Sequence, residues 1–347
     1  MVFSPAPELT VTIEAGGSGN DARHPDIHLH AGGQGVWQAR MIRSLDVPVV
    51  MCAVLGGEPG RVLAPLIKAE RIDLRAVQAT ERNPAYVHDR RDGTRKELAR
   101  APGVRLSRHT LDELYSVALA EGLRAPVSVL AGVQDAGVVP PDVYRRLAGD
   151  LSRNGCKVVA DLTGEYLDAV LAGGLTLVKV SHDQLVNDAR SGHDGAEALI
   201  AAMHALHEDG AESVVVSRAD KPALALIGDE VVEVQMPSLE PADSRGAGDS
   251  MTAGVAAVLA TGGDLVHAVR SGAAAGALNV TRHGLGTGRA DAIEGLLERV
   301  KLVRFPSGEP VPEQDAGLAR YTPSVARPVS TDDHASPSDL ADRARPR

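Results

Sequence analysis

The chain is poor in cysteine and in aromatic residues, and both shortages narrow what it can do. Two cysteines among 347 residues exclude a disulfide framework and a multi-cysteine zinc site. Aromatic residues make up only 2% of the chain, which leaves no stacking platform for nucleic-acid bases. The 46 acidic residues exceed the 36 basic ones, and the net charge of -10 disfavours nucleic acid or an anionic membrane as a partner.

Long apolar runs are also missing. The longest strongly apolar run, Val47 to Leu55, is far shorter than the roughly 20 residues that a membrane-spanning helix needs. The segment from Met1 to Glu14 has neither a positively charged start nor an uninterrupted apolar stretch, so we expect no export signal. The sequence therefore predicts a cytoplasmic protein without a membrane partner.

The chain does contain short Val- and Ile-rich runs that alternate with amphipathic stretches of helical period. This alternation is typical of parallel βαβ units and predicts an α/β fold. Two segments interrupt the rhythm, Asp26 to His30 and Ala85 to Leu98, and predict antiparallel strands outside the main sheet. The other predicted strands are Leu9–Ile13, Val47–Leu55, Val127–Leu130, Lys157–Asp161, Leu175–Val180, Ser213–Ser217, Ala223–Ile227 and Val231–Val234. The predicted helices are Gln34–Leu45, Pro59–Glu70, Arg108–Glu121, Pro141–Arg153, Asp194–Glu208, Gly248–Thr261, Leu265–Arg282 and Ala290–Val300.

The composition changes toward the C-terminal end. From about Gly308 the chain is rich in Pro, Ser, Asp and Arg without periodicity, which predicts disorder. We expect one folded domain over residues 8–305 and a disordered tail over residues 306–347.

A small-residue loop that opens a helix is the strongest chemical signal. The segment from Asp243 to Asp249 reads Asp-Ser-Arg-Gly-Ala-Gly-Asp. Backbone N–H groups at a helix N-terminus bind anions, and Gly246 and Gly248 let that backbone approach a phosphate closely. The carboxylate of Asp249 would repel a phosphate, so it is better suited to act as a base toward an attacking hydroxyl. The alternative is a plain glycine loop whose Asp favours the helix dipole.

The longer context of this loop decides between the two interpretations. It resembles the second signature of the ribokinase-like PfkB carbohydrate kinase family, Asp/Asn-Ser/Thr-x-Gly-Ala-Gly-Asp. The resemblance extends over roughly Leu9 to Val300. It implies a doubly wound, mostly parallel sheet with helices on both faces and a small β lid, formed here from about residues 22–32 and 84–99. It also implies that Asp249 is the catalytic base and that Gly246, Ala247 and Gly248 hold the transferring phosphoryl group.

A second glycine segment, Ala31 to Arg40, resembles the first signature of the same family in its 1-phosphofructokinase and tagatose-6-phosphate kinase branch. Gln34 stands where that branch has Lys, and Trp37 stands where it has Asn. These positions face the sugar and its phosphate in that branch, which implies a rebuilt substrate pocket. The substrate-binding residues implied by the resemblance are Gly32, Gly33, Gln34, Trp37, His88, Arg95 and Gly132.

Further segments resemble the family's nucleotide and magnesium elements. The run from Lys179 to Leu185 is similar to Lys-Pro-Asn-x-x-Glu-Leu, with Ser181 and Gln184 in place of Asn and Glu. A neutral amide attracts a hydrated divalent ion less than a carboxylate does, so magnesium would rely mainly on the nucleotide phosphates. The implied metal residues are Gln184 and Asp243, and the implied nucleotide-binding residues are Lys179, Ser181, Ser217, Arg218, Asp220, Ser244, Asn279 and Gly286.

The predicted activity is transfer of the γ-phosphoryl group of ATP, with Mg²⁺, to a hydroxyl of a sugar phosphate such as a fructose phosphate. A P-loop and a dinucleotide-binding glycine motif are both missing from the sequence. Two alternatives stay open: a catalytically weak sugar sensor of the same fold, and a kinase for another polyol or a nucleoside. Relatives of this kind also suggest a homodimer.

Overall fold

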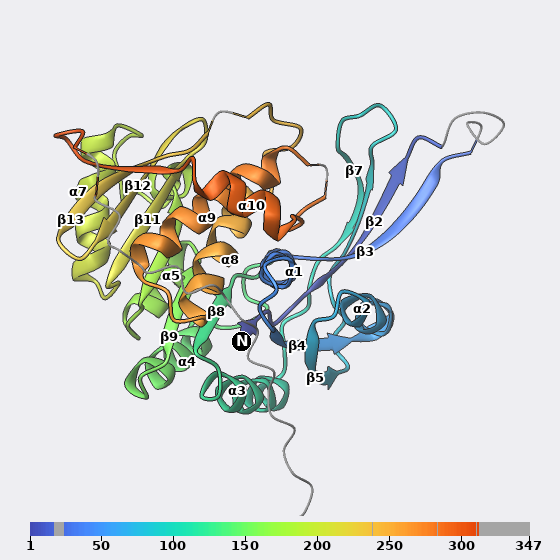
Figure 1. The fold of residues 1–347 in the computed structure, drawn as a ribbon. Coiled ribbons are helices and arrows are strands. Elements are labelled where there is room, and N and C mark those ends of the chain that lie inside the picture. The colour runs from blue at the N-terminus through green and yellow to red at the C-terminus, as the bar shows by residue number, and fades with distance from the viewer. Residues whose placement is uncertain (17–23, 238, 283, 310, 312–347) are drawn as a thin grey trace, which may run out of the picture. The chain divides into compact units, whose positions relative to one another are not determined.

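Ten strands form the main sheet of the computed structural model, which describes residues 1–16, 24–237, 239–282, 284–309 and 311 (Figure 1). Seven neighbouring strands, from β11 to β5, run parallel, and β12, β13 and β14 extend the sheet as antiparallel strands. In spatial order the strands are β14 (Lys301–Arg304), β13 (Glu230–Gln235), β12 (Lys221–Ile227), β11 (Ser213–Arg218), β10 (Leu177–Ser181), β9 (Lys157–Asp161), β8 (Val127–Ala131), β1 (Val2–Phe3), β4 (Val50–Gly56) and β5 (Asp73–Ala79).

Helices cover both faces of this sheet. Successive strand side chains point to opposite faces, so Val2 packs into one apolar cluster and Phe3 into the other. One cluster includes α1 (Gln34–Ser44), α2 (Gly57–Ala69), α8 (Ala247–Ala260), α9 (Leu265–Val280) and α10 (Ala290–Leu297). The other includes α3 (Arg108–Gly122), α4 (Pro141–Arg153), α5 (Gly164–Leu171), α6 (His182–Asn187) and α7 (Ala196–Glu208). The predicted α/β class with a mostly parallel, doubly wound sheet is confirmed.

A small sheet stands apart from the main one, with the order β3 (Asp26–Gly32), β2 (Glu8–Glu14), β6 (Ala85–Asp89) and β7 (Lys96–Ala101). The buried amide of Asn83 connects it to the main sheet. Asn83 accepts a hydrogen bond from Gly56 N at 2.8 Å and donates to Pro7 O and Val54 O. The predicted lid segments lie in this sheet, except for residues 22 and 23, which fall outside the described residues.

The predicted strand Leu9–Ile13, grouped above with the strands of the main sheet, does not belong to that sheet. These residues belong to β2 of the small sheet, and the central strand is the two-residue β1. The reason is visible in the pattern, because Thr10 and Thr12 are buried on one face of β2 while Val11 and Ile13 are only half-buried on the other. A central parallel strand is apolar on both faces. The elements β1, β5, β14, α5 and α6 were not predicted.

The C-terminal part of the described chain ends on the core. Val311 packs against the apolar cluster of α1 and α8, and its N–H donates to Leu302 O at 3.0 Å. Most of the predicted tail, residues 312–347, lies outside the described residues. Within the part of the chain that the structure describes, no helix is long and apolar enough to cross a bilayer.

Candidate active site

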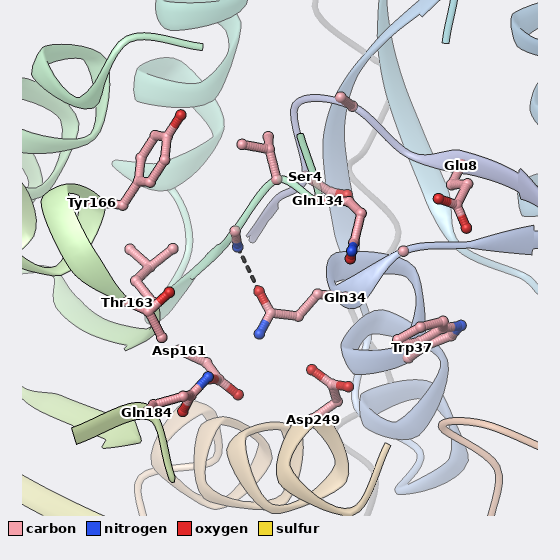
Figure 2. Close-up of a pocket in the computed structure, with 15 residues that line it drawn as sticks. Ser4, Glu8, Gln34, Trp37, Gln134, Asp161, Thr163, Tyr166, Gln184 and Asp249 are labelled. Atoms are coloured by element: carbon pink, nitrogen blue, oxygen red, sulfur yellow. Dashed lines mark hydrogen bonds between the residues drawn. The ribbon is translucent and has the colours of Figure 1, made fainter. Parts of the chain in front are cut away.

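A pocket of about 260 Å³ lies at the carboxyl ends of the central parallel strands (Figure 2). Ser4 follows β1, Gly132 follows β8 and Asp161 ends β9. The chain builds the sheet outward from β1 in both directions, and such a switch point is where doubly wound sheets bind ligands. The pocket is lined by Ser4, Ala6, Glu8, Gly33, Gln34, Trp37, Gly132, Val133, Gln134, Asp161, Leu162, Thr163, Tyr166, Gln184 and Asp249.

The predicted anion-binding loop opens helix α8 beside this pocket. Gly246 precedes the helix with a φ of 73°, a left-handed conformation that favours glycine. No side chain among the described residues caps this helix end. The first N–H groups of α8, those of Ala247, Gly248 and Asp249, are therefore available to an anion. Figure 2 shows the carboxylate of Asp249 pointing from the start of α8 into the pocket.

A buried lysine lies against the same loop. Nζ of Lys179 pairs with Oδ2 of Asp161 at 3.4 Å, and Thr252 donates a hydrogen bond to the same oxygen at 3.1 Å. A Cβ added at Gly248 would lie 2.3 Å from Nζ of Lys179. The structure thus brings a cation and the unpaired N–H groups of α8 to one place, which suits a phosphoryl group.

The environment of Asp249 disfavours its negative charge. Burial and the nearby charge of Asp161 raise the pKa of Asp249 to about 7, and Lys179 opposes this shift. Gln34 and Gln38 of α1 also lie beside the carboxyl and lower its pKa. A carboxyl group poised near neutral pH can take a proton from a hydroxyl more effectively than an ordinary aspartate. At the far side of the pocket, burial raises the pKa of Glu8, against the charges of Arg100 and Arg95.

Six of the predicted site residues line the pocket: Gly33, Gln34, Trp37, Gly132, Gln184 and Asp249. Gln34 is central to it, because its Oε1 accepts a hydrogen bond from Gly132 N at 2.5 Å. Gly32 lies next to this group, packed against Thr10 of β2.

Two predicted substrate contacts do not reach the pocket. His88 is 3% exposed and its Nε2 hydrogen-bonds with Oγ1 of Thr12 at 3.2 Å. Burial and the charges of Arg95, Arg90 and Arg245 lower the pKa of His88 to about 4, so its ring is neutral at physiological pH. Arg95 stacks on Tyr86 and donates a hydrogen bond to its hydroxyl at 3.1 Å.

The predicted nucleotide residues lie outside the pocket lining, at several separate places. Ser217, Arg218 and Asp220 lie at the β11–β12 turn, where the buried Arg218 donates to Pro222 O and to Glu233. Asn279 joins two loops, since its Nδ2 donates to Arg245 O and its Oδ1 accepts from Gly286 N. Ser244 is exposed beside the α8 loop, and Ser181 caps α6. The side chain of Lys179 lies against Gly248, at the start of α8.

The described residues offer no ready-made metal cage, because no group of three or more His, Cys, Asp or Glu side chains among them could hold an ion. Gln184 accepts a hydrogen bond from Ser181 N at 2.6 Å, and Asp243 accepts three from Arg245. Burial tends to raise the pKa of Asp243, but these bonds and the charges of Arg245 and Arg90 lower it. Mg²⁺ commonly binds through substrate phosphates and water with few protein ligands, and Gln184 and Asp243 stay the predicted residues that would hold it here.

Sequence reasoning missed several pocket residues, among them Asp161, Glu8 and Tyr166. The sequence could have identified Asp161 as a site residue. Its carboxylate directly follows the apolar run Val158–Ala160 and so lies at the carboxyl end of a strand, where doubly wound sheets bind ligands. The sequence analysis could not identify Glu8 as a site residue, because the strand that it begins was assigned to the wrong sheet.

The comparisons with known proteins agree with this geometry. The model of the pfkB family carbohydrate kinases matches residues 9–292. The chain belongs to this family. It is therefore a phosphotransferase that acts on an alcohol group, and the predicted family is confirmed.

Two curated relatives illustrate the similarity. The 1-phosphofructokinase of Xanthomonas campestris pv. campestris is 30% identical over 269 residues, which cover 75% of this chain and 83% of that protein. The ATP-dependent 6-phosphofructokinase isozyme 2 of Escherichia coli (strain K12) is 28% identical over 259 residues, 73% of this chain and 82% of that protein.

Solved structures share the fold of this kinase. Phosphofructokinase-2 from Escherichia coli in complex with fructose-6-phosphate matches with a TM-score of 0.73 and 24% identity, over 86% of this chain and 97% of that one. Arabidopsis thaliana ribokinase complexed with ribose and ATP matches with a TM-score of 0.64 and 20% identity, over 86% of this chain and 97% of that one.

Proposed function

We propose that this chain transfers the γ-phosphoryl group of ATP to a carbohydrate hydroxyl, with Asp249 as the general base. The observation that carries the proposal is the position of the Asp249 carboxylate, which lies in the pocket at the open N-terminus of α8. Few arrangements place a proton acceptor directly beside an anion cradle, and phosphoryl transfer requires both.

In the proposed reaction each residue of the site has a separate role. Asp249 takes the proton from the acceptor hydroxyl as the new O–P bond forms and the bond between the β- and γ-phosphates breaks. The N–H groups of Ala247 and Gly248, together with Lys179, stabilise the charge on the transferring group. Mg²⁺, when bound, neutralises the nucleotide phosphates. Because reactions of this kind depend on ATP, the proposed function favours a cytoplasmic location.

ATP as the donor is supported by the names of two proteins of this fold, an ATP-dependent 6-phosphofructokinase and a ribokinase complexed with ATP. The acceptor is inferred from the relatives in the same way. The names of the curated relatives favour a phosphorylated hexose, which is also the sequence prediction. The ribokinase complexed with ribose shows that the fold also holds an unphosphorylated sugar.

A homodimer through the small sheet is supported by its surface. Ile27 and Leu29 of β3 pair with Ile13 and Val11 of β2, so the four side chains share one face. Ile27 is 61% exposed and Leu29 is 47% exposed. Large apolar side chains grouped on an exposed face are typical of an interaction surface.

A turnover assay tests the proposed function. The purified chain is mixed with ATP, Mg²⁺ and a panel of hexoses, pentoses, their phosphates and nucleosides, and ADP release is measured. We expect at least one sugar or sugar phosphate to be turned over. A chain that is stabilised against heat by a sugar yet releases no ADP with any acceptor would be a sensor, and the proposed kinase activity would be wrong.

A further inference from the structure

The charges of the pocket bear on the chemical class of the acceptor. Three carboxylates, those of Glu8, Asp161 and Asp249, belong to the described residues that line the pocket, and none of these residues is Lys, Arg or His. A phosphate monoester carries a charge of about -1.5 to -2 at neutral pH. A site for such a group is expected to supply cations or several N–H donors at the position of the phosphate.

The positions at which a phosphate partner was expected do not supply one. Gln34 and Trp37 line the pocket, and both side chains are uncharged. His88 is buried, hydrogen-bonded to Thr12 and outside the pocket lining. The guanidinium of Arg95 is held on the ring and hydroxyl of Tyr86.

Other cations near the pocket are held by carboxylates. Arg100 pairs with Asp135 at 2.5 Å, and Arg40 forms two hydrogen bonds to Glu70, at 2.5 and 2.6 Å. Lys179 is paired with Asp161 and lies against Gly248, at the start of α8. Its charge therefore serves the phosphoryl group that is transferred, and Asp161 already balances it.

The remaining pocket surface suits hydroxyl groups. Figure 2 shows Glu8 and Trp37 on the side of the pocket away from Asp161 and Gln184. The carboxylate of Glu8 can accept hydrogen bonds from hydroxyls, and the amides of Gln34 and Gln134 can both donate and accept them. The indole of Trp37 offers an apolar surface for the C–H groups of a sugar.

We propose that the acceptor of this kinase is an uncharged sugar or polyol, and that the pocket discriminates against its phosphate esters. The inference rests on the proposed function for the identity of the site, but it concerns binding and can be tested by binding alone. The net charge of -10 acts in the same direction, since it repels a dianionic acceptor at long range.

The test uses matched pairs: fructose with fructose 1-phosphate and fructose 6-phosphate, and ribose with ribose 5-phosphate. Both kcat/KM of the natural chain and equilibrium binding to Asp249→Asn are measured for each member. We expect the unphosphorylated member of the preferred pair to be favoured by about tenfold or more, the loss expected when one charge-assisted contact is missing. Equal or tighter binding of the phosphate ester would overturn the inference.

A variant tests whether charge is the cause. Glu8→Gln removes the pocket carboxylate at nearly constant shape, and Glu14→Gln makes the same change at the other end of β2, outside the pocket lining. Glu8→Gln should shift the binding ratio toward the phosphorylated member by about tenfold, whereas Glu14→Gln should leave the ratio unchanged. An unchanged ratio in Glu8→Gln would contradict the inference. If the sugar binds tenfold better but no acceptor of the turnover panel is phosphorylated, the proposed function fails and the inference stands. If no member of any pair binds, the inference fails, and the turnover panel tests the proposed function separately.

Discussion

At the scale of single residues, the site depends on how Asp249 is charged. Asp161 raises its pKa and Lys179 lowers it, while Asp161 and Lys179 are themselves paired at 3.4 Å. The three side chains come from β9, β10 and α8, so no one segment of the chain sets the ionisation of the base. Asp161 acts on Asp249 through its negative charge, so it is a positioning residue rather than a catalytic one.

The pH dependence of kcat/KM tests this arrangement. A base works only when ionised, so activity should fall as the pH drops through about 7, the pKa of Asp249. Asp161→Asn removes a charge that raises this pKa, so the acidic limb should move to lower pH. Asp112→Asn, an exposed change on α3, should leave the limb in place. An acidic limb that did not move in Asp161→Asn would contradict the assigned coupling.

The same shift has a consequence for stability. The unfolded chain releases the proton of Asp249 near pH 3.8, whereas the folded chain keeps it up to about pH 7. Because the folded state binds more protons between these values, this group makes the free energy of unfolding decrease as the pH rises from about 4 to 7.

At the scale of elements, the start of α8 combines a strained backbone with a binding function. Gly246→Ala would place a side chain at a φ of 73°, which costs about 1 to 3 kcal/mol of folding free energy, beside Leu285 and Asn279. Gly228→Ala, in the β12–β13 turn, has a φ of 60° and open space around it, so it carries similar strain far from the pocket. Urea unfolding should show both variants destabilised.

ATP binding separates the two variants. Gly246→Ala should also weaken ATP binding or lower kcat by about tenfold or more, because it distorts the N–H groups that hold the phosphoryl group. Gly228→Ala should keep both. Equal activity of the two variants after correction for the folded fraction would contradict the role given to the α8 loop.

Features that depend on contiguous residues were predicted from the sequence, whereas features that depend on contacts between distant residues were not. The helix start at Gly246 to Asp249 and the apolar central strands β8 to β11 depend on contiguous residues, and their positions were predicted to within about two residues. The ion pair of Asp161 and Lys179 joins two strands, and no local pattern contains it. The strand from Leu9 to Ile13 was assigned to the wrong sheet because its alternation of Thr with Val and Ile, which is unlike a central parallel strand, was not weighed. The expected role of His88 depended on its burial, which a single sequence does not display.

At the scale of the whole molecule, the topology of the main sheet brings the residues of the site together. The chain starts at the central strand β1 and adds strands on both sides of it, so loops from distant parts of the sequence meet at one edge. The small sheet contributes Glu8, the first residue of β2, to the lining of the pocket. A site shared between two sheets can close over a substrate and exclude water, which would otherwise accept the phosphoryl group.

The small sheet also carries the predicted dimer surface. The double change Ile27→Asp with Leu29→Asp should convert a dimer into a monomer, because charges would be buried at the interface. Leu123→Asp changes an exposed leucine directly after α3, away from this surface, and should leave the dimer intact. Light scattering coupled to gel filtration measures the mass. A natural chain that is monomeric, or a double variant that stays dimeric, would contradict this interface.

The most direct test of the whole account is the turnover number of Asp249→Asn. The amide keeps the shape of the side chain but cannot take the proton of the acceptor hydroxyl, so kcat should fall by about 10²- to 10⁴-fold while ATP still binds. Asp112→Asn should keep full activity. If Asp249→Asn turned over its acceptor at the natural rate, the carboxylate at the start of α8 would not be the base, and the proposed mechanism would be wrong.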